Sequence, residues 1–256
     1  MPNNFFDLNG KSVIVTGSTK GIGRAIAEAL AGAGANVVIS SRKADKCEAV
    51  AQSICAAGRR AIAIPCNIGK KEELANLVAE TRKQFGQIDV LVCNAAVNPY
   101  FGPMAALPDD AFTKVIDSNV RSNLWLANMV MPEMAERRDG SIIIVSSIGG
   151  LKGSANLGIY CVSKAADMQL ARNLAVEWGP KNIRVNCIAP GLVRTDFARA
   201  LWENPETLAK AESGTPLRRI GDPEDIAGVA VLLASRAGNW ITGQTIVVDG
   251  GVTISG

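Results

Sequence analysis

Residues 12–23 read SVIVTGSTKGIG, an apolar run that leads directly into a glycine-rich loop. The run is rich in Val and Ile, as expected for a parallel strand that is buried on both faces of a sheet. The glycines of the loop permit a tight turn and let the backbone approach a pyrophosphate, and a helical pattern follows them. The start of that helix would offer free N–H groups and a partial positive charge. This order of strand, loop and helix predicts a dinucleotide-binding site.

The same alternation continues along the chain. Strand-like runs lie at residues 12–16, 36–40, 60–65, 88–93, 141–146, 183–189 and 245–248, and helical patterns lie between them, for example at 21–32, 44–57 and 72–85. Alternating strands and helices predict an α/β fold with a doubly wound parallel sheet of about seven strands in a three-layer αβα arrangement. No linker interrupts the pattern, so we expect residues 1–256 to form a single dinucleotide-binding and catalytic domain. The segment at about 194–214 departs from the alternation, and we expect it to form a helical lid over the substrate.

The composition excludes several classes of function. The net charge is +3 and no block of like charges occurs, so neither nucleic acid nor an anionic membrane is an expected partner. We expect no secretory signal in the first ten residues and no transmembrane helix, because no long uninterrupted apolar run exists. The six cysteines include no C-x-x-C pair, which indicates free thiols and a cytoplasmic protein.

Histidine is absent from the chain. This absence removes the Ser-His-Asp triad and the H-E-x-x-H zinc site, and we expect no metal. A general acid must therefore be Tyr, Lys, Cys, Asp or Glu.

The end of the second strand bears on the choice of cofactor. Residues 38–43 read VISSRK, with no carboxylate to hold the 2′-hydroxyl of NAD. Arg42 has a planar guanidinium suited to phosphate, Ser41 can donate a hydrogen bond, and Lys20 adds a donor from the glycine loop. These residues favour NADP(H). NAD(H) stays possible because Asp45 lies close by, and Arg42 and Lys43 could instead be solvated loop charges.

A candidate acid/base pair follows the fifth predicted strand. Tyr160 and Lys164 are four residues apart in a helical stretch, so they share one face of the helix. Ser147 comes just after that strand, and ligand sites of open α/β sheets lie at the carboxyl ends of the strands. The three side chains therefore predict a catalytic site at that edge, although a Y-x-x-x-K pair alone also occurs in ordinary helices.

These motifs together resemble the "classical" subgroup of the short-chain dehydrogenase/reductase family, which has a Rossmann-type fold. The resemblance covers residues 6–251 and is carried by TGSTKGIG at 16–23, CNAA at 93–96, Asn119, Ser147, Tyr160 with Lys164, and PGLVRT at 190–195. The stretches NPYFG at 98–102, NIRVNC at 182–187 and RRIGDPEDIAG at 218–228 are similar to the NADPH-dependent carbonyl reductase/retinol dehydrogenase branch.

The resemblance implies a role for each matched catalytic residue. Tyr160 would give a proton to the carbonyl oxygen, and Ser147 would donate a hydrogen bond to that oxygen. Lys164 would bind the nicotinamide ribose and favour the Tyr160 phenolate. Asn119 would hold a water molecule that links Lys164 to solvent.

The resemblance also implies a cofactor-binding set. Asn94 would lie beside the adenosine-side ribose, and Val193 and Thr195 would fix the carboxamide. The full set is Gly17, Ser18, Thr19, Lys20, Gly21, Ile22, Gly23, Ser41, Arg42, Asn67, Ile68, Asn94, Ala95, Tyr160, Lys164, Pro190, Gly191, Val193 and Thr195. The chain departs from the family pattern at Cys93, at Ala96, where Gly is usual, and at Asn67, where Asp commonly binds adenine.

We therefore expect an oxidoreductase that transfers a hydride between NADP(H) and a small carbonyl or secondary alcohol. We expect the pocket wall to be apolar, which suits an uncharged substrate. Its residues would be Ile148, Leu151, Leu192, Phe197, Leu201 and Trp202. Arg194 and Lys152 keep a 3-oxoacyl-thioester (acyl carrier protein) reductase as an alternative, and a non-catalytic dinucleotide sensor is a third. The resemblance implies a homotetramer.

Overall fold

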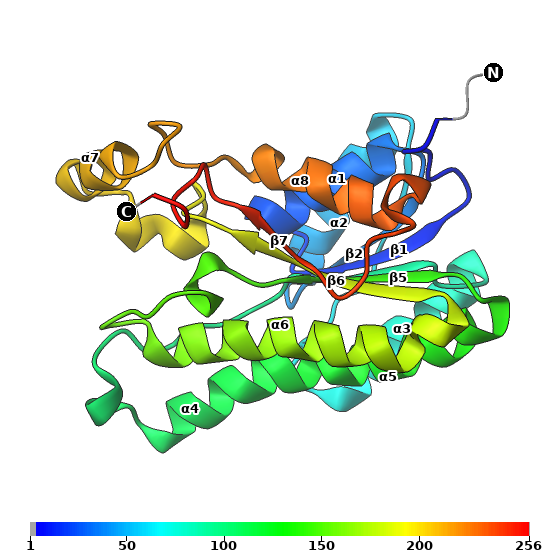
Figure 1. The fold of residues 1–256 in the computed structure, drawn as a ribbon. Coiled ribbons are helices and arrows are strands. Elements are labelled where there is room, and N and C mark those ends of the chain that lie inside the picture. Colours follow the sequence, from blue (N-terminus) through cyan, green and yellow to red (C-terminus); the bar gives the residue numbers. More distant parts are fainter. Residues whose placement is uncertain (1–3, 256) are drawn as a thin grey trace.

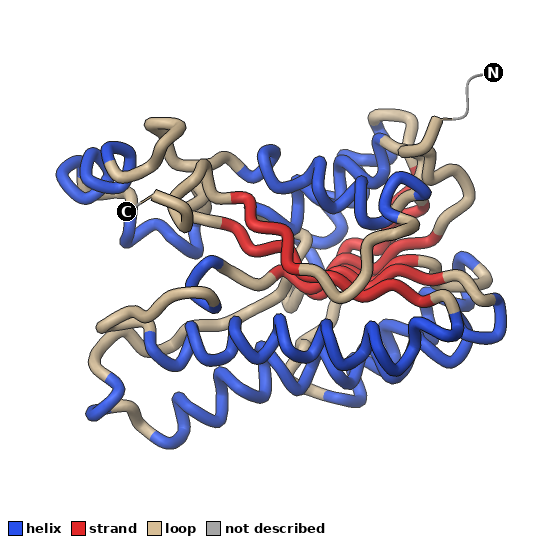
Figure 2. The backbone as a smooth tube through the Cα atoms, viewed as in Figure 1, coloured by secondary structure: helices blue, strands red, loops and turns tan. Residues whose placement is uncertain are grey.

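The computed structural model describes residues 4–255; residues 1–3 and 256, which the predicted domain includes, lie outside the described residues. Seven parallel strands form one sheet in the order β3-β2-β1-β4-β5-β6-β7. Figure 2 shows the strands of this sheet in red, between layers of helices in blue. The strands are β1 (Ser12–Thr16), β2 (Asn36–Ser40), β3 (Arg60–Ala63), β4 (Val90–Cys93), β5 (Gly140–Val145), β6 (Ile183–Pro190) and β7 (Thr245–Val248). The prediction of a doubly wound, single-domain α/β fold is confirmed.

Helices cover both faces of the sheet (Figure 1). On one face lie α1 (Gly21–Gly32), α2 (Ala44–Ala56) and α8 (Pro223–Ala234); on the other lie α3 (Lys71–Phe85), α5 (Ser122–Arg137) and α6 (Gly158–Trp178). Alternate side chains of β1 explain this arrangement. Val13 and Val15 pack into the core beneath α1 and α8, whereas Ile14 points into the core beneath α5 and α6. Both faces of each central strand are thus apolar, as the continuous Val and Ile runs predict.

The strand order reverses beside β1. The chain passes from β1 to β2 and β3 on one side, and then crosses to β4 on the other side of β1. The loops that leave β1 and β4 therefore diverge and open a crevice at the carboxyl edge of the sheet, where open α/β proteins bind ligands. Asn94, just after β4, spans this point: its backbone N–H donates to Thr16 Oγ1 over 3.0 Å and its Nδ2 donates to Thr16 O over 2.9 Å.

Two irregular segments lie near this edge. A single π-helical turn (Asp117–Arg121) joins α4 (Asp109–Ile116) to α5. Between β6 and α8, the predicted lid segment contains a short 3-10 helix (Asp196–Leu201) and α7 (Pro205–Ser213). No helix within residues 4–255 combines the length and the apolar character needed to span a bilayer.

Candidate active site

The Tyr160 helix is held close to the loop that carries Ser147. Ser147 follows β5 and caps the short 3-10 helix Ile148–Gly150, where its Oγ accepts a hydrogen bond from Gly149 N over 3.0 Å. A Cβ added at Gly149 would lie 3.4 Å from Ser147 Oγ and 3.9 Å from Tyr160 Cε1. Ser147 Oγ and the Tyr160 ring therefore both lie close to this glycine.

A second glycine sets the distance between that loop and α6. A Cβ at Gly150 would lie 2.8 Å from Ala165 N and from the carbonyl carbon of Lys164. Only a residue without a side chain lets the loop approach the helix backbone so closely. Gly150 thus fixes the position of Ser147 relative to α6.

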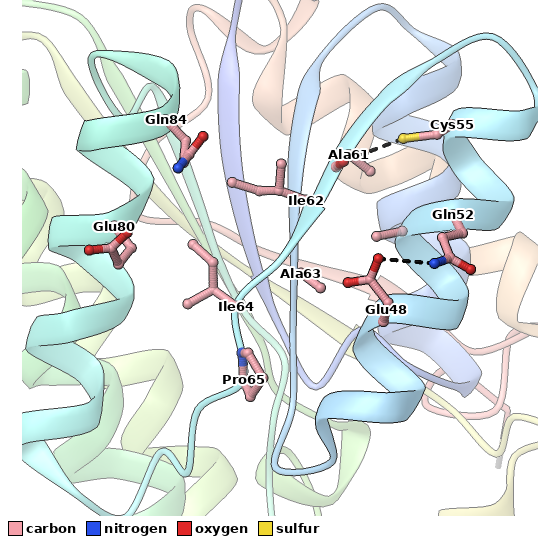
Figure 3. A pocket seen from close by; sticks show the side chains of 11 residues that line it. Glu48, Gln52, Cys55, Ala61, Ile62, Ala63, Ile64, Pro65, Glu80 and Gln84 are labelled. Carbon is pink, nitrogen blue, oxygen red and sulfur yellow. Dashed lines mark hydrogen bonds between the residues drawn. The ribbon is translucent and has the colours of Figure 1, made fainter.

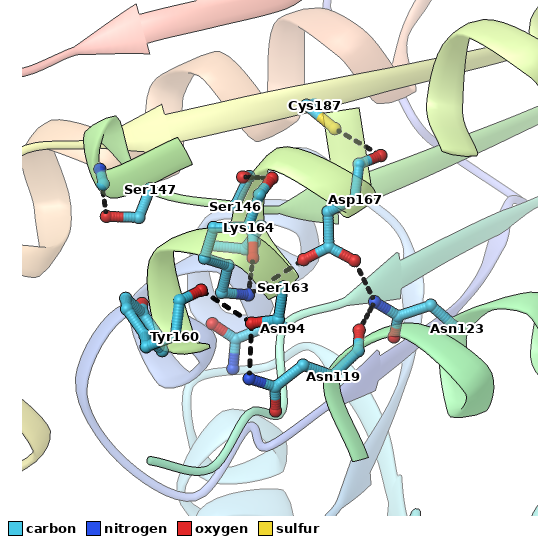
Figure 4. Close-up of polar contacts among 12 residues, drawn as sticks. Asn94, Asn119, Asn123, Ser146, Ser147, Tyr160, Ser163, Lys164, Asp167 and Cys187 are labelled. Atoms are coloured by element: carbon cyan, nitrogen blue, oxygen red, sulfur yellow. Dashed lines mark hydrogen bonds and ion pairs between the residues drawn. The ribbon is translucent and has the colours of Figure 1, made fainter. Parts of the chain in front are cut away.

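Lys164 lies one turn after Tyr160 and is almost completely buried. Its side chain is 3% exposed, its Nζ lies 5.7 Å from the centroid of the Tyr160 ring, and it donates to Val145 O over 2.9 Å (Figure 4). It also forms an ion pair with Asp167, whose Oδ2 is 3.1 Å from Nζ. Burial, the largest single effect, lowers the pKa of Lys164, but the charges of Asp167, Tyr160 and Cys187 and the hydrogen bond to Asp167 together raise it, and the net result is a raised pKa. Lys164 is therefore an ammonium ion beside the Tyr160 ring.

Asn119 belongs to the π-helical turn and points at the same cluster. Its Oδ1 accepts from Val97 N over 2.8 Å, and its Nδ2 donates to Ser163 Oγ over 3.1 Å. Ser163 Oγ in turn donates to Tyr160 O over 2.7 Å. The π-helical turn thus holds Asn119 next to the Tyr160 helix, and such turns are frequent at functional sites.

Two of the residues in this cluster were not predicted from the sequence. Asp167 and Asn123 are both buried, and Asn123 Nδ2 donates to Asp167 Oδ1 over 3.0 Å and to the main-chain carbonyl of Asn119. The signal that could have found Asp167 is its spacing, three residues after Lys164 on the same helix face. Asn123 carries no local signal, because its contacts depend on how α5 packs against α6.

The glycine loop adopts the close geometry that its sequence predicts. Gly17 has a φ of +68°, and a Cβ there would lie 2.8 Å from Asn94 Nδ2. A Cβ at Gly23 would overlap Asn94 Nδ2 and Gly17 O. Lys20 is the N-cap of α1, and no side chain caps the first turn of this helix. The free N–H groups of that turn therefore face the crevice between β1 and β4.

At the end of β2, Thr19 and Ser41 meet. Thr19 Oγ1 donates to Ser41 Oγ over 3.3 Å, and Arg42 next to it is exposed. Lys20 does not join them: its Nζ lies 3.2 Å from Asp196 Oδ2, across the crevice. The structure therefore brings together Ser41 and Thr19, with Arg42 adjacent in sequence, and directs Lys20 elsewhere.

Asn67, the residue expected near the adenine, forms hydrogen bonds with residues of its own loop and of α3. Asn67 Oδ1 accepts from Gly69 N over 3.1 Å, and Asn67 N donates to Glu73 Oε2 over 2.7 Å. Ile68, beside it, packs against the core beneath α3. The Asn67 amide N–H₂ has no hydrogen bond among these contacts and lies on the surface loop that follows β3.

At the other end of the crevice, β6 ends at Pro190, and Gly191 follows it. Val193 forms an isolated bridge with Gly221, and Thr195 caps the following 3-10 helix by accepting from Ala198 N over 3.3 Å. A Cβ at Gly21 would lie 3.0 Å from Thr195 Cγ2. The segment after β6 therefore touches the glycine loop, and it closes the crevice from the side opposite to Ser41.

One of the predicted pocket side chains, Phe197, lies near Tyr160. The ring of Phe197 lies 5.9 Å from the Tyr160 ring and is 55% exposed. Trp202 Nε1 donates to Thr195 O over 3.0 Å, and the guanidinium of Arg194 lies 5.3 Å from the Trp202 ring. The short helix 196–201 thus presents the Phe197 ring toward the phenol.

A separate pocket of about 470 Å³ lies at the edge of the sheet, between α2, β3 and α3 (Figure 3). Its walls are Glu48, Ala51, Gln52, Cys55, Ala61, Ile62, Ala63, Ile64, Pro65, Glu80 and Gln84. None of the side chains around Tyr160 lines it. We therefore take the crevice, and not this pocket, as the candidate active site.

The sequence and the fold are similar to those of known proteins. A family model described as enoyl-(acyl carrier protein) reductase matches residues 17–253. The chain is 44% identical over 244 residues to dehydrogenase/reductase SDR family member 4 of Bos taurus, which covers 95% of this chain and 88% of the relative.

Two solved structures carry dinucleotides in a very similar fold. A 7α-hydroxysteroid dehydrogenase complexed with NADH and 7-oxo glycochenodeoxycholic acid is 38% identical, with a TM-score of 0.94 over 98% of this chain and 97% of that one. A gluconate 5-dehydrogenase from Burkholderia cenocepacia in complex with NADP and tartrate is 29% identical, with a TM-score of 0.94 over 99% of both chains.

Proposed function

The chain belongs to the short-chain dehydrogenase/reductase family, and we propose that it reduces an uncharged carbonyl compound with NADPH, using Tyr160 as the acid. Family membership makes it an oxidoreductase that interconverts carbonyl and alcohol groups. The observation that carries the finer proposal is the arrangement of Lys164, Tyr160 and Ser147 at the carboxyl edge of β5.

The chemistry assigns one task to each of these side chains. Ser147 Oγ would donate a hydrogen bond to the substrate oxygen and orient it toward Tyr160. The Tyr160 hydroxyl would give its proton to that oxygen as the alcohol forms, and in the reverse direction the phenolate would take the proton back. The Lys164 ammonium stabilises the phenolate by its charge. When bound, the nicotinamide cofactor supplies or accepts the hydride.

The residues that surround the crevice fit a dinucleotide. Gly17 and Gly23 leave no room for a side chain, so their backbone faces the crevice without obstruction. The first turn of α1 offers free N–H groups to a pyrophosphate. Asn98 Oδ1, in the loop after β4, is buried without a hydrogen-bond partner among the described residues, so it could accept from a bound group.

The preference for NADPH rests on the end of β2. Ser41 and Thr19 place two hydroxyl groups together, and the exposed guanidinium of Arg42 follows directly. The closest downstream carboxylate, that of Asp45, lies 3.7 Å from the ammonium of Lys46, which reduces its repulsion of a phosphate. NAD(H) remains compatible with the fold, since the similar solved structures contain NADH in one case and NADP in the other.

An apolar, uncharged substrate is favoured over an acyl carrier protein thioester. Phe197 stands beside the Tyr160 ring. Arg194, which an anionic carrier would need, lies against Trp202 and 3.8 Å from the Asp222 carboxylate. Its charge is thus partly compensated within the chain.

We also propose a homotetramer in the cytoplasm. Exposed apolar side chains, including Trp240 at 100% and Val176 at 81%, mark the region before β7 and the outer face of α6. Such side chains suit contacts between copies of the chain. The six cysteines are free thiols, as a reducing compartment allows.

A panel of ketones, aldehydes and secondary alcohols, followed by NADPH absorbance, tests the proposal. Tyr160→Phe should lower the turnover of the best substrate by about a thousandfold, because proton transfer contributes ~10²–10⁴ in rate. NADPH binding, measured by fluorescence quenching, should stay within about twofold, since the phenol ring remains. Substantial residual turnover in this variant would assign the acid to another group.

A further inference from the structure

Asp167 is a buried carboxylate next to the lysine of the site. It lies three residues after Lys164 on α6, it is 0% exposed, and its Oδ2 is 3.1 Å from Lys164 Nζ (Figure 4). Within residues 4–255, no other carboxylate forms an ion pair with Lys164. Because burying a carboxylate is costly unless it is paired and hydrogen-bonded, this position calls for an explanation beyond packing.

Both oxygens of the Asp167 carboxylate accept hydrogen bonds. Its second oxygen, Oδ1, accepts from Asn123 Nδ2 over 3.0 Å. The same Asn123 amide donates to the main-chain carbonyl of Asn119. Asp167 and Asn123 therefore connect the ammonium of Lys164 to the π-helical turn through direct hydrogen bonds.

The other titratable groups around this pair come from three elements. Tyr160 lies on α6 itself, Cys93 lies on β4 and Cys187 lies on β6. Burial raises the pKa of both thiols, so these cysteines stay neutral. From α5 the facing side chain is the uncharged Asn123. Burial raises the pKa of Asp167, whereas the Lys164 ammonium 3.1 Å away and the Asn123 N–H group favour the carboxylate form. The local charges are thus the Lys164 cation and the Asp167 anion.

We propose that Asp167 is a positioning residue. It holds the Lys164 ammonium by an ion pair and thereby limits how strongly Lys164 stabilises the Tyr160 phenolate. Two of the three N–H bonds of Lys164 are used by Asp167 and Val145, so one remains for the crevice. The carboxylate also offsets part of the positive charge that Tyr160 experiences. The protonated phenol is then favoured, which is the form that donates a proton in carbonyl reduction. This inference rests on the function proposed above.

The direction of the effect follows from electrostatics. A nearby negative charge makes loss of a proton less favourable for every group coupled to it, and removal of that charge has the opposite effect. Asp167→Asn keeps the shape and removes the charge. The variant should therefore form tyrosinate at lower pH than the parent protein, by about one pH unit.

The chain makes this measurement direct, because it contains two tyrosines, Tyr100 and Tyr160. In a Tyr100→Phe background, tyrosinate absorbance reports Tyr160 alone and needs no substrate. Asp167→Asn should move the midpoint of this absorbance change down, whereas Lys164→Gln should move it up. Glu177→Gln removes an exposed carboxylate from the same helix and should leave it in place.

The outcomes separate this inference from the proposed function. An unchanged or raised midpoint in Asp167→Asn, with the fold intact by circular dichroism, would overturn the inference while leaving the reaction untouched. Absence of carbonyl turnover in the parent protein would overturn the function, whereas the absorbance titration would still decide the role of Asp167. If Asp167→Asn does not fold, Asp167→Ala removes the same charge without leaving an amide to satisfy, and it should give the same downward shift.

Discussion

Lys20 Nζ lies 3.2 Å from Asp196 Oδ2, so a residue of the glycine loop is joined to the helix that follows β6. Both side chains are largely exposed, and Asp196 also accepts from Arg199 over 2.9 Å. The ion pair spans the crevice in which a dinucleotide would lie.

This pair predicts a competition between Asp196 and the cofactor for Lys20. Lys20→Ala should weaken NADPH binding several-fold, because one cation that can bind phosphate is lost. Asp196→Asn should strengthen binding about twofold, because it frees the ammonium. Dissociation constants from fluorescence titration measure both effects. Weaker binding in both variants would mean that the ion pair persists in the complex.

A second prediction concerns the choice between NADPH and NADH. Arg42→Ala should lower kcat/KM for NADPH by about tenfold or more, because a charge-assisted hydrogen bond of ~1.5–3 kcal/mol is lost. Turnover with NADH should change little. Arg59→Ala is the matched control, since it removes an exposed arginine just before β3, at the amino ends of the strands and not at the carboxyl ends, where Arg42 lies. An equal loss with both cofactors would remove Arg42 from the 2′-phosphate site.

A third prediction tests the spacing between the Ser147 loop and α6. Gly150→Ala places a methyl group 2.8 Å from backbone atoms of Lys164 and Ala165. We expect a stability loss of about 1–3 kcal/mol and a lower kcat, because the loop must move away from the helix. Gly153→Ala, where a Cβ meets nothing within 4 Å, is the control. Urea unfolding and steady-state kinetics measure the two effects, and equal behaviour of the two variants would contradict the prediction.

A fourth prediction concerns acid stability. Arg219 Nη2 donates to Asp225 Oδ1 over 2.8 Å, and this hydrogen bond, together with one from Asp222 N, lowers the pKa of Asp225 to about 2. A lowered pKa in the folded state adds stability above the unfolded value of 3.8, and the contribution is lost as the pH falls toward about 2. The Tm difference between the parent protein and Asp225→Asn should therefore shrink between those two pH values. A difference independent of pH would contradict this reasoning.

The strands and helices were predictable from the sequence because their burial leaves a pattern. Element ends were less so: the apolar run at 60–65 extends past β3, which ends at Ala63, although Ile64 N still donates to Ile39 O over 3.0 Å. The positions of Tyr160, Lys164 and Ser147 followed from motif spacing and strand ends. The sequence alone therefore predicts that these three side chains lie at the same edge of the sheet.

The buried partners were not accessible in the same way. Asp167 lies in the polar-looking stretch KAADMQ, where a charged residue on a helix usually faces solvent. Its burial depends on α5 supplying Asn123, a tertiary contact that no local pattern encodes. The π-helical turn at 117–121 likewise has no sequence signature here, and the pairing of Lys20 with Asp196 joins residues 176 positions apart.

The side chains proposed to carry out the reaction and those proposed to contact the substrate lie on different segments of the chain. Ser147, Tyr160 and Lys164 all lie on one continuous stretch from the end of β5 into α6, whereas Phe197 and Trp202 belong to an excursion between β6 and α8. That excursion contributes no strand to the sheet. Exchanging residues 197–213 for those of another member of the family should therefore graft a new selectivity onto an unaltered reaction centre.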